Sequence, residues 1–220
     1  MIKISQEAQL AHNALLSKGL ENPILKEYNG IEEKERELLI AKYIYKIMYI
    51  LNLDTKNDSL KNTPDRISKM YNKEIFLGLD YKNFPKITFI ENVIKSSDII
   101  IVRDITLMST CEHHFITIYG KADIAYIPRK KIIGLSKINR IAQFYSKRPQ
   151  IQERLTKQIR VVLQTLLGTK DIAIVLNMNH FCVKTRGICD VNSTVITSSL
   201  KGLFKTSKSI RDQFLFKNNL

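Results

Sequence analysis

Apolar residues in the first third of the chain recur at the spacing of buried helix faces. The first such pattern follows Ser5, a residue typical of helix N-termini, and stops near Gly19. The second follows Gly30, and the third starts with Thr63 as cap and Pro64 at the first helical position. We therefore expect three helices, each with one buried stripe. The expected buried residues are Ala8, Ala11 and Leu15 in the first helix, Ile40, Tyr43, Ile44, Ile47, Met48 and Leu51 in the second, and Ile67, Met70 and Tyr71 in the third.

From about residue 85 the pattern changes to runs rich in β-branched residues, which favour strands. Two helical patterns interrupt these runs, and strands resume after them. This order predicts an α+β unit with antiparallel pairing, preceded by an N-terminal helical region over residues 1–95. The expected strands are residues 86–90, 99–111, 116–127, 132–133, 172–183 and 194–200, and the expected helices are residues 136–145, capped by Ser136, and 150–167, stopped by Gly168.

The composition is that of an ordinary globular protein, with 44% hydrophobic and 25% charged residues among 220. No apolar run approaches the roughly 18 residues of a membrane span, and the first residues do not resemble a signal peptide. Three cysteines at uneven spacing argue against the disulfide framework of a secreted protein. We therefore expect a cytoplasmic protein without a membrane partner.

The net charge of +14 lies almost entirely in the second half of the chain. Residues 1–110 carry 16 Lys and Arg against 15 Asp and Glu, whereas residues 111–220 carry 19 against 6. Three explanations fit this surplus: a lysine-rich solvated surface, a site for a polyphosphate substrate, or a groove for nucleic acid. The charge pattern alone does not choose among them.

Five of the seven cysteines and histidines fall in two short runs, Cys111-Glu112-His113-His114 and His180-Phe181-Cys182. Thiolates and imidazoles are the usual zinc ligands, and catalytic zinc typically takes three of them. Alternation along a strand predicts that His180 and Cys182 face one site while Phe181 faces the core. In the first run, a turn would pair Cys111 with His114 and a continuing strand would pair it with His113. Spacing therefore leaves the choice of histidine open.

Two further groups carry candidate binding chemistry. Gln152 and Glu153 begin a predicted helix, where a carboxylate either complements the helix dipole or accepts two parallel hydrogen bonds, as from N1 and the exocyclic amine of guanine. The run 134–137 is the other group, in which a helix N-terminus with Lys137 and Arg140 on one face suits phosphate oxygens. A capped helix with a basic face is common, so this second signal is weak by itself.

Several multi-residue motifs stand in a characteristic order. They are Thr63-Pro64-Asp65-Arg66 with Lys69, Cys111-Glu112-His113-His114, Tyr126-Ile127-Pro128, Gly134-Leu135-Ser136-Lys137, Gln150-Ile151-Gln152-Glu153-Arg154-Leu155-Thr156, His180-Phe181-Cys182 with Arg186-Gly187, and Thr197-Ser198-Ser199-Leu200-Lys201-Gly202. In order and spacing they resemble GTP cyclohydrolase I. The resemblance covers most of the chain from about residue 50 onward, and so many motifs together are far more specific than any single one.

The resemblance implies hydrolytic opening of the purine ring of GTP, release of C8 as formate, and formation of 7,8-dihydroneopterin triphosphate, the first step of tetrahydrofolate biosynthesis. It implies one Zn²⁺ per subunit, which would activate water for attack on C8. The implied zinc ligands are Cys111, His114 and Cys182. The implied catalytic residues are His113 and His180, which transfer protons, and Ser136 near the ribose. The implied substrate ligands are Gln152, Glu153 and the backbone at Leu135 for guanine, and Arg66, Lys69, Lys137, Arg140 and Arg186 for the triphosphate.

The resemblance also implies a tunnelling-fold (T-fold) catalytic domain over residues 96–220. In the family, ten subunits form two five-membered rings, and the strands expected at residues 99–127 and 172–200 would close into a barrel. Active sites would then lie between neighbouring chains, and GTP rather than nucleic acid would be the anionic partner. Asn177-Met178-Asn179 departs from the family, which often has an acidic residue there, so the hydrogen-bond partner of His180 is expected to be missing or replaced. Cys189 has no motif role.

Two alternative functions are compatible with part of the sequence. A structural zinc protein that binds nucleic acid through its basic half would need a fourth protein ligand, for which the cysteines are too few. A different T-fold enzyme acting on a pterin or a deazaguanine would share the Glu153 pocket but not the whole zinc set. Formation of formate and a pterin from GTP distinguishes the main interpretation from both.

Overall fold

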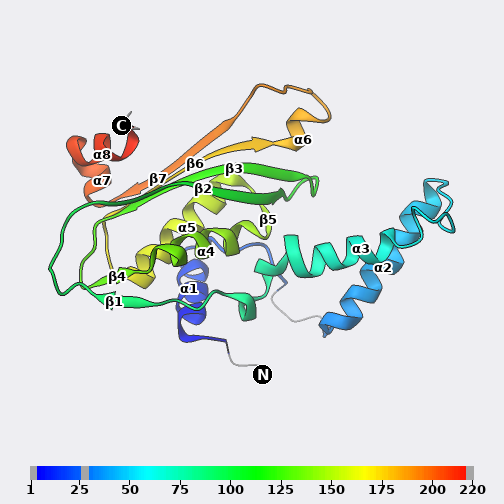
Figure 1. Cartoon of the computed structure of the whole chain (residues 1–220), viewed down its shortest axis with the longest axis horizontal. Coiled ribbons are helices and arrows are strands. Elements are labelled where there is room, and N and C mark those ends of the chain that lie inside the picture. The colour runs from blue at the N-terminus through cyan, green and yellow to red at the C-terminus, as the bar shows by residue number, and fades with distance from the viewer. Residues whose placement is uncertain (1–3, 26–29, 217–220) are drawn as a thin grey trace.

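The computed structural model describes residues 4–25 and 30–216 (Figure 1). The helices are α1 (Gln6–Leu16), α2 (Glu33–Ile50), α3 (Thr63–Met70), α4 (Leu135–Ser146), α5 (Gln152–Leu167), α6 (Phe181–Lys184), α7 (Leu203–Thr206) and α8 (Lys208–Leu215), with short π and 3₁₀ helices η1 (Tyr71–Ile75), η2 (Leu77–Leu79) and η3 (Tyr81–Asn83). The strands are β1 (Phe89–Glu91), β2 (Ile100–Cys111), β3 (Thr117–Tyr126), β4 (Lys131–Ile133), β5 (Pro149–Gln150), β6 (Ile172–His180) and β7 (Val195–Lys201).

The main sheet has five strands in the order β5-β2-β3-β6-β7. Strands β2, β3, β6 and β7 pair antiparallel, and β5 adds two residues in parallel to the end of β2. A register shift between Val102 and Ile105, with Asp104 at a φ of 55°, marks a bulge in β2. Beyond the bulge the side chains alternate, so that Leu107 is buried and Met108 is exposed. The predicted α+β class with antiparallel strands is confirmed.

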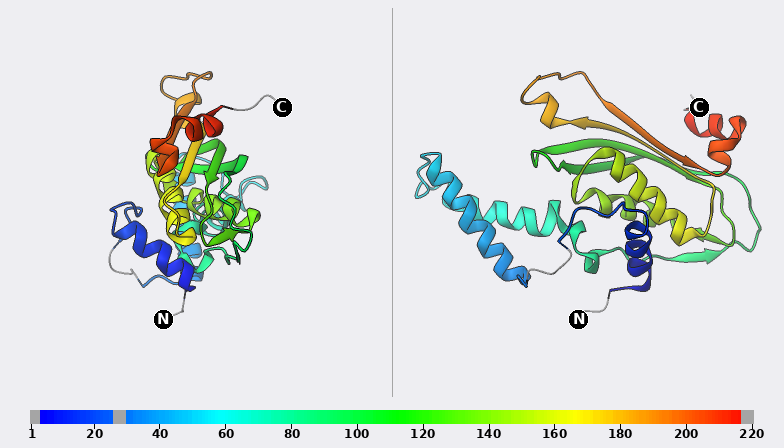
Figure 2. Two further views of the ribbon diagram at one scale, coloured as in Figure 1. Left: turned by 90° about the vertical axis from the view of Figure 1, so that its left-hand side faces the viewer. Right: turned by 180° about the vertical axis from the view of Figure 1, so that it is seen from behind.

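Helices α4 and α5 cover one face of this sheet, and α1 packs against α5 on the side away from the strands (Figures 1 and 2). Leu155, Ile159, Val162 and Leu166 form a buried stripe along α5, and Gly168 ends the helix, as predicted, in the left-handed conformation at a φ of 65°. Each fully buried aliphatic side chain in this core contributes about 1.5–3 kcal/mol relative to exposure. Packing of α4 and α5 on the sheet therefore sets the positions of their first turns, which carry several of the predicted site residues.

Helices α2 and α3 pack on each other and project away from the sheet (Figures 1 and 2). The prediction that α2 carries a buried stripe is wrong for the single chain. Of its six residues only Met48 is buried, whereas Tyr43, Ile47 and Leu51 are 58%, 51% and 64% exposed. Because α2 touches α3 but not the core under the sheet, its apolar spacing has too little of this chain to pack against.

Several predicted element ends are also wrong. Gly134 rather than Ser136 occupies the N-cap of α4, and Asn62 rather than Thr63 occupies that of α3. Strand β6 ends at His180 and the chain turns at once into α6, so Phe181 is 37% exposed instead of facing the core. Strand β5 and helices α7 and α8 were not predicted. Among the described residues, no helix combines the length and apolar character needed to cross a bilayer.

Candidate metal and active site

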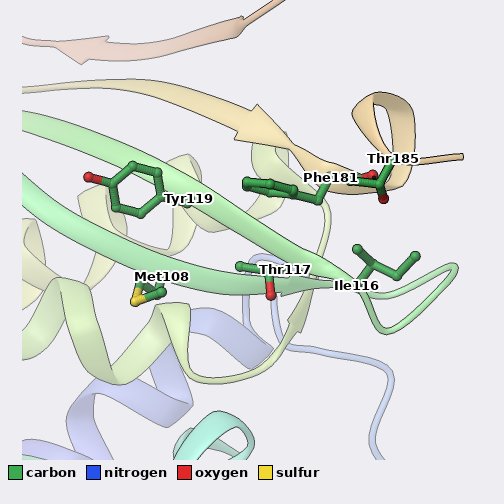
Figure 3. Close-up of a pocket in the computed structure, with 6 residues that line it drawn as sticks. All are labelled: Met108, Ile116, Thr117, Tyr119, Phe181 and Thr185. Atoms are coloured by element: carbon green, nitrogen blue, oxygen red, sulfur yellow. Dashed lines mark hydrogen bonds between the residues drawn. The ribbon is translucent and has the colours of Figure 1, made fainter. Parts of the chain in front are cut away.

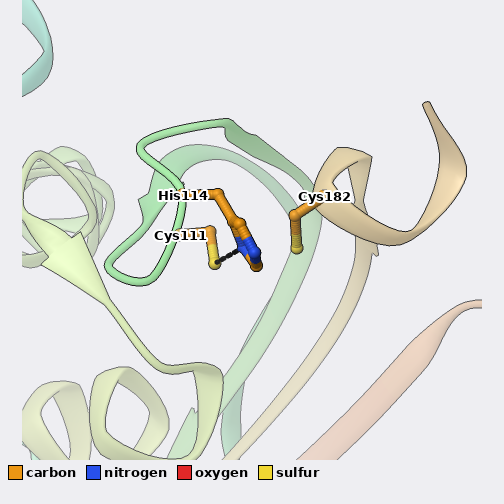
Figure 4. A group of neighbouring side chains, drawn as sticks. All are labelled: Cys111, His114 and Cys182. Atoms are coloured by element: carbon orange, nitrogen blue, oxygen red, sulfur yellow. Dashed lines mark hydrogen bonds between the residues drawn. The ribbon is translucent and has the colours of Figure 1, made fainter. Parts of the chain in front are cut away.

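A cluster of metal-ligating atoms lies where β2 ends and β6 passes into α6 (Figure 4). Cys111 is the last residue of β2, His114 lies in the turn before β3, and Cys182 lies in α6. Pairing of Ile118 in β3 with His180 in β6 brings α6 beside that turn. One ligand atom from each of the three residues lies within 4.8 Å of the others. Residues that are 71 positions apart along the chain thus form one site.

The chemistry of these donors fits a zinc ion. Two thiols and an imidazole are a typical donor set for zinc with an open fourth position. Burial and the adjacent Cys111 thiol raise the pKa of the Cys182 thiol, while the Arg186 guanidinium lowers it. Two neighbouring thiolates repel each other unless a cation lies between them, so the pair is suited to a positive ion.

Both histidines of the turn approach the first cysteine. The Nδ1 atoms of His113 and His114 each lie 3.8 Å from Cys111 Sγ. Among the described residues, only His114 also groups with Cys182, and its Nε2 lies 3.0 Å from Nη1 of Arg186. His113 is exposed beside the cluster. The geometry therefore groups Cys111, His114 and Cys182 and leaves His113 outside the donor set.

His180 lies at the same end of the sheet but contacts a different group. Its Nε2 lies 2.8 Å from Oε1 of Gln152, the first residue of α5. Burial lowers the pKa of the His180 imidazole, and the nearby Glu153 carboxylate opposes that shift. Burial therefore favours the neutral imidazole, in which one ring nitrogen can accept a proton.

Glu112, between Cys111 and His113, pairs with Arg154 of α5. Arg154 also donates from Nε to Oε1 of Gln150 and from Nη2 to the carbonyl oxygen of Pro149, each at 3.1 Å. The turn with the candidate ligands is thereby attached to both β5 and α5. Sequence reasoning noticed Arg154 only as part of a motif, because its partner lies 42 residues away.

Comparison with known proteins identifies the family. The family model of GTP cyclohydrolase I matches residues 40–218. The chain belongs to the GTP cyclohydrolase I family. It is 71% identical to GTP cyclohydrolase 1 of Buchnera aphidicola subsp. Schizaphis graminum over 99% of this chain and 100% of that protein. It is 56% identical to the enzymes of Erwinia tasmaniensis and Salmonella choleraesuis, over 98% of this chain and 97% of theirs.

Membership of the GTP cyclohydrolase I family makes the chain a hydrolase that acts on GTP. The family uses zinc, for which Cys111, His114 and Cys182 are a compatible group, and its members are oligomers.

The two side chains predicted to bind guanine differ in exposure. Glu153 is exposed at the start of α5, close to His180. Gln152, in contrast, is only 2% exposed, and its amide is engaged by protein groups. A guanine contact of that side chain stays a prediction, to which the enclosed amide lends no support.

Four other predicted site residues lie far from the metal group in this chain: Leu135, Ser136, Lys137 and Arg140. Strand β2 has 12 residues, so its ends lie roughly 35 Å apart at about 3.3 Å per residue. Cys111 is at one end, whereas Tyr126, which pairs with Ile100, is at the other and leads within nine residues to the start of α4 (Figure 1). A GTP cyclohydrolase I site that uses both sets needs more than one chain.

Three of the predicted triphosphate ligands lie on α3 or just after α6. Arg66 and Lys69 are exposed on α3. The ring of Phe76, which follows η1, lies 5.2 Å from that of Phe115. Phe115 lies in the turn between β2 and β3, residues 112–116, which we call the metal turn. The end of the helical arm formed by α2 and α3 therefore adjoins the site. Arg186 follows α6 and reaches His114 directly. These three cations therefore share the metal end of the chain.

A pocket of about 290 Å³ lies next to the metal group (Figure 3). It is lined by Met108, Ile116, Thr117, Tyr119, Phe181 and Thr185. Met108 and Tyr119 belong to the sheet face that α4 and α5 leave uncovered. The lining has no charged side chain for a triphosphate and none of the predicted catalytic residues, so this pocket is not the expected GTP site of the family.

Proposed function

We propose that this protein converts GTP and water to 7,8-dihydroneopterin triphosphate and formate, with the active site at the metal end of the sheet. The observation that carries this proposal is the cluster of Cys111, His114 and Cys182 beside two further histidines and Glu153. Family membership supplies the reaction, and the cluster supplies the chemistry that the reaction needs.

In this proposal Cys111, His114 and Cys182 hold Zn²⁺, which when bound would activate water as a nucleophile near neutral pH. His113 transfers protons at the purine, since it lies beside the donor set without belonging to it. His180 acts as the second acid or base, supported by the depressed pKa of its imidazole. Ser136 acts near the ribose.

Guanine is proposed to bind through the Glu153 carboxylate and the backbone at Leu135. A carboxylate accepts hydrogen bonds from both N1 and the exocyclic amine of guanine. Adenine offers no matching pair of donors, so a desolvated Glu153 would stay unpaired at a cost of several kcal/mol. We therefore expect ATP to be rejected.

The triphosphate is proposed to bind Arg66, Lys69, Lys137, Arg140 and Arg186. Because Lys137 and Arg140 lie at the opposite end of the sheet from Arg186, we propose that neighbouring chains contribute them. A ring of five subunits whose sheets close into a T-fold barrel, stacked in pairs as a decamer, would bring one end of each chain to the other end of its neighbour. Nucleic acid and membrane have no part in this site.

We propose a cytoplasmic location. Its support is that Cys111, Cys182 and Cys189 are all free thiols, as is usual in a reducing compartment.

The test supplies zinc-loaded protein with GTP and measures formate and, after oxidation, the fluorescent pterin. We expect both products in equal amounts from GTP and neither from ATP. Full zinc occupancy without product would contradict the proposal.

The division of roles is tested by two variants. His113→Ala should retain zinc and lose turnover by about 10²–10⁴-fold, the usual contribution of a positioned acid or base. Cys182→Ala should lose the metal itself, as measured by elemental analysis after gel filtration. Equal loss of zinc in both variants would show that the ligand assignment is wrong.

A further inference from the structure

The orientation of the Gln152 amide is determined by its partners. Its nitrogen lies 3.3 Å from the carbonyl oxygen of Leu176, 2.9 Å from that of Val195 and 3.0 Å from Oγ1 of Thr197. Carbonyl oxygens only accept hydrogen bonds, so the amide NH₂ must face these strands and not His180. The amide oxygen Oε1 is therefore the atom that faces Nε2 of His180, at 2.8 Å.

Two threonines make this orientation self-consistent. The Thr156 hydroxyl donates to the backbone carbonyl oxygen of Gln152 at 2.8 Å, which uses its only proton. Thr197 Oγ1 lies 2.7 Å from Thr156 Oγ1, so Thr197 must be the donor of that pair. Its lone pairs then remain free to accept from the Gln152 amide. The two amide protons are thus shared among three acceptors, and turning the amide over would break at least two hydrogen bonds.

An amide oxygen cannot donate, so the contact with His180 requires a proton on Nε2. A neutral imidazole carries one proton, which leaves Nδ1 as the acceptor atom of the ring. In the part of the chain that the structure describes, no protein group hydrogen-bonds Nδ1 of His180. The ring thus enters the site with one nitrogen occupied by Gln152 and the other available.

We propose that Gln152 is a positioning residue that fixes His180 as the Nε2–H tautomer, so that proton transfer takes place at Nδ1. The tautomer follows from the hydrogen bonds alone, whereas its consequence for turnover rests on the proposed role of His180 in GTP hydrolysis. Gln152, at the start of α5, then fills the place of the acidic residue that the family often has at residues 177–179. It replaces the guanine contact predicted for this side chain.

The tautomer is tested on the zinc-loaded wild-type enzyme with ¹⁵N-labelled histidine. The chain has four histidines, so the imidazole spectrum is simple, and His180→Asn identifies the signals of residue 180. We expect a protonated Nε2 and a bare Nδ1 at His180. A proton on Nδ1 overturns the proposal without recourse to any variant of Gln152.

The positioning role is tested with Gln152→Met, which keeps the length of the side chain and removes its acceptor. We expect retained zinc, a mixed tautomer at His180, and a fall in kcat for GTP on the order of 10- to 100-fold, typical of losing an orienting partner. KM for GTP should stay within about twofold, since an interaction used only in the reaction step lowers kcat. A raised KM with unchanged kcat would instead indicate that the Gln152 side chain binds guanine, and it would overturn the proposal.

Thr197→Val is the matched control. It removes one acceptor of the amide but leaves the carbonyl oxygens of Leu176 and Val195, so the amide should not turn. We expect the Nε2–H tautomer and nearly wild-type kcat, and a tautomer change as large as in Gln152→Met would overturn the proposed mechanism of orientation. If wild-type protein shows the Nε2–H tautomer but no GTP turnover, the proposed function fails while the tautomer assignment holds.

Discussion

Glu112 lies between two residues assigned to the active site, yet its carboxylate is bound by Arg154 and not by either histidine. Both side chains are largely enclosed, with 13% and 23% of the Arg154 and Glu112 side chains exposed. A pair in such surroundings contributes more through orientation than through Coulomb attraction, because desolvation offsets much of the gain. At the scale of single residues, the metal turn is held by groups that are not ligands.

Arg154→Met should therefore affect both folding and metal binding. Loss of hydrogen bonds to a charged group predicts a fall of about 1.5–3 kcal/mol in the free energy of unfolding. Freeing the turn should weaken zinc binding by about 10-fold, measured by competition with a chelator. Arg160→Met is the control, since Arg160 on the same helix bonds Ser199 and should cost stability without affecting zinc.

The pair itself is isolated by a double-mutant cycle with Glu112→Gln. Arg154→Met leaves an unpaired carboxylate, so the double variant should lose less than the sum of the single losses. Strict additivity would mean that Arg154 acts on the turn through Gln150 and Pro149 alone.

Whole elements were predictable wherever one chain supplies both the pattern and its partner. The apolar spacing of α1 and α5 and the apolar runs of β2, β3 and β6 identify elements that bury many of those residues against each other. Strand β5 was missed because two residues carry no periodicity and pair only in the folded sheet. Helix α8 was missed although its signal was present: Ser207 caps it, and Phe214 is buried.

The candidate site shows the same limit. The grouping of Cys111, His114 and Cys182 followed from family motifs, whereas the strand alternation used for His180 and Cys182 was wrong because β6 ends at His180. Contacts such as Gln152 with Thr197 join residues 45 positions apart through the packing of α5 on β7. No local pattern encodes that packing, so no reading of the sequence alone could orient the amide.

Gly120 in β3 tests the close packing of the central strands. A Cβ there would lie 2.1 Å from the carbonyl oxygen of Asn177 and 2.7 Å from Cα of Met178 on β6. Because the obstacle is backbone, Gly120→Ala should force β3 from β6 and lower stability by at least about 1–3 kcal/mol, the usual range for overpacking. The measurement is the unfolding midpoint in urea at fixed protein concentration.

Gly168→Ala serves as the comparison for Gly120→Ala. No atom lies within 4 Å of a Cβ at Gly168, but its φ of 65° costs an alanine about 1–2 kcal/mol. It should leave zinc binding unchanged, whereas displacement of β6 by Gly120→Ala should also weaken zinc binding through Cys182. Equal zinc affinity in the two variants would show that the metal end does not depend on this strand pairing.

The whole molecule leaves two kinds of surface without a partner in the single chain. Within the described residues, β7 pairs on one side only, and β2 is paired on its outer side only at Thr110 and Cys111. Open edges of this length invite pairing with another chain. The exposed apolar face of α2 is the second surface, and it lies on the arm that projects from the sheet (Figure 2). An oligomer of the family's kind would cover both.

Separate surfaces predict that assembly can be interrupted in steps. In the proposed assembly of two five-membered rings, strand edges are suited to closing each ring. Tyr43, Ile47 and Ile50 on one face of α2 are then available to join the two rings. The double variant Ile47→Lys/Ile50→Lys keeps helix-forming residues but places charge on that face. Sedimentation should therefore show a species of half the wild-type mass. Leu16→Lys, at a leucine of α1 that is 54% exposed, should keep the full mass. Full mass in both variants would show that α2 does not join the rings, and separation into single chains would show that it also holds each ring together.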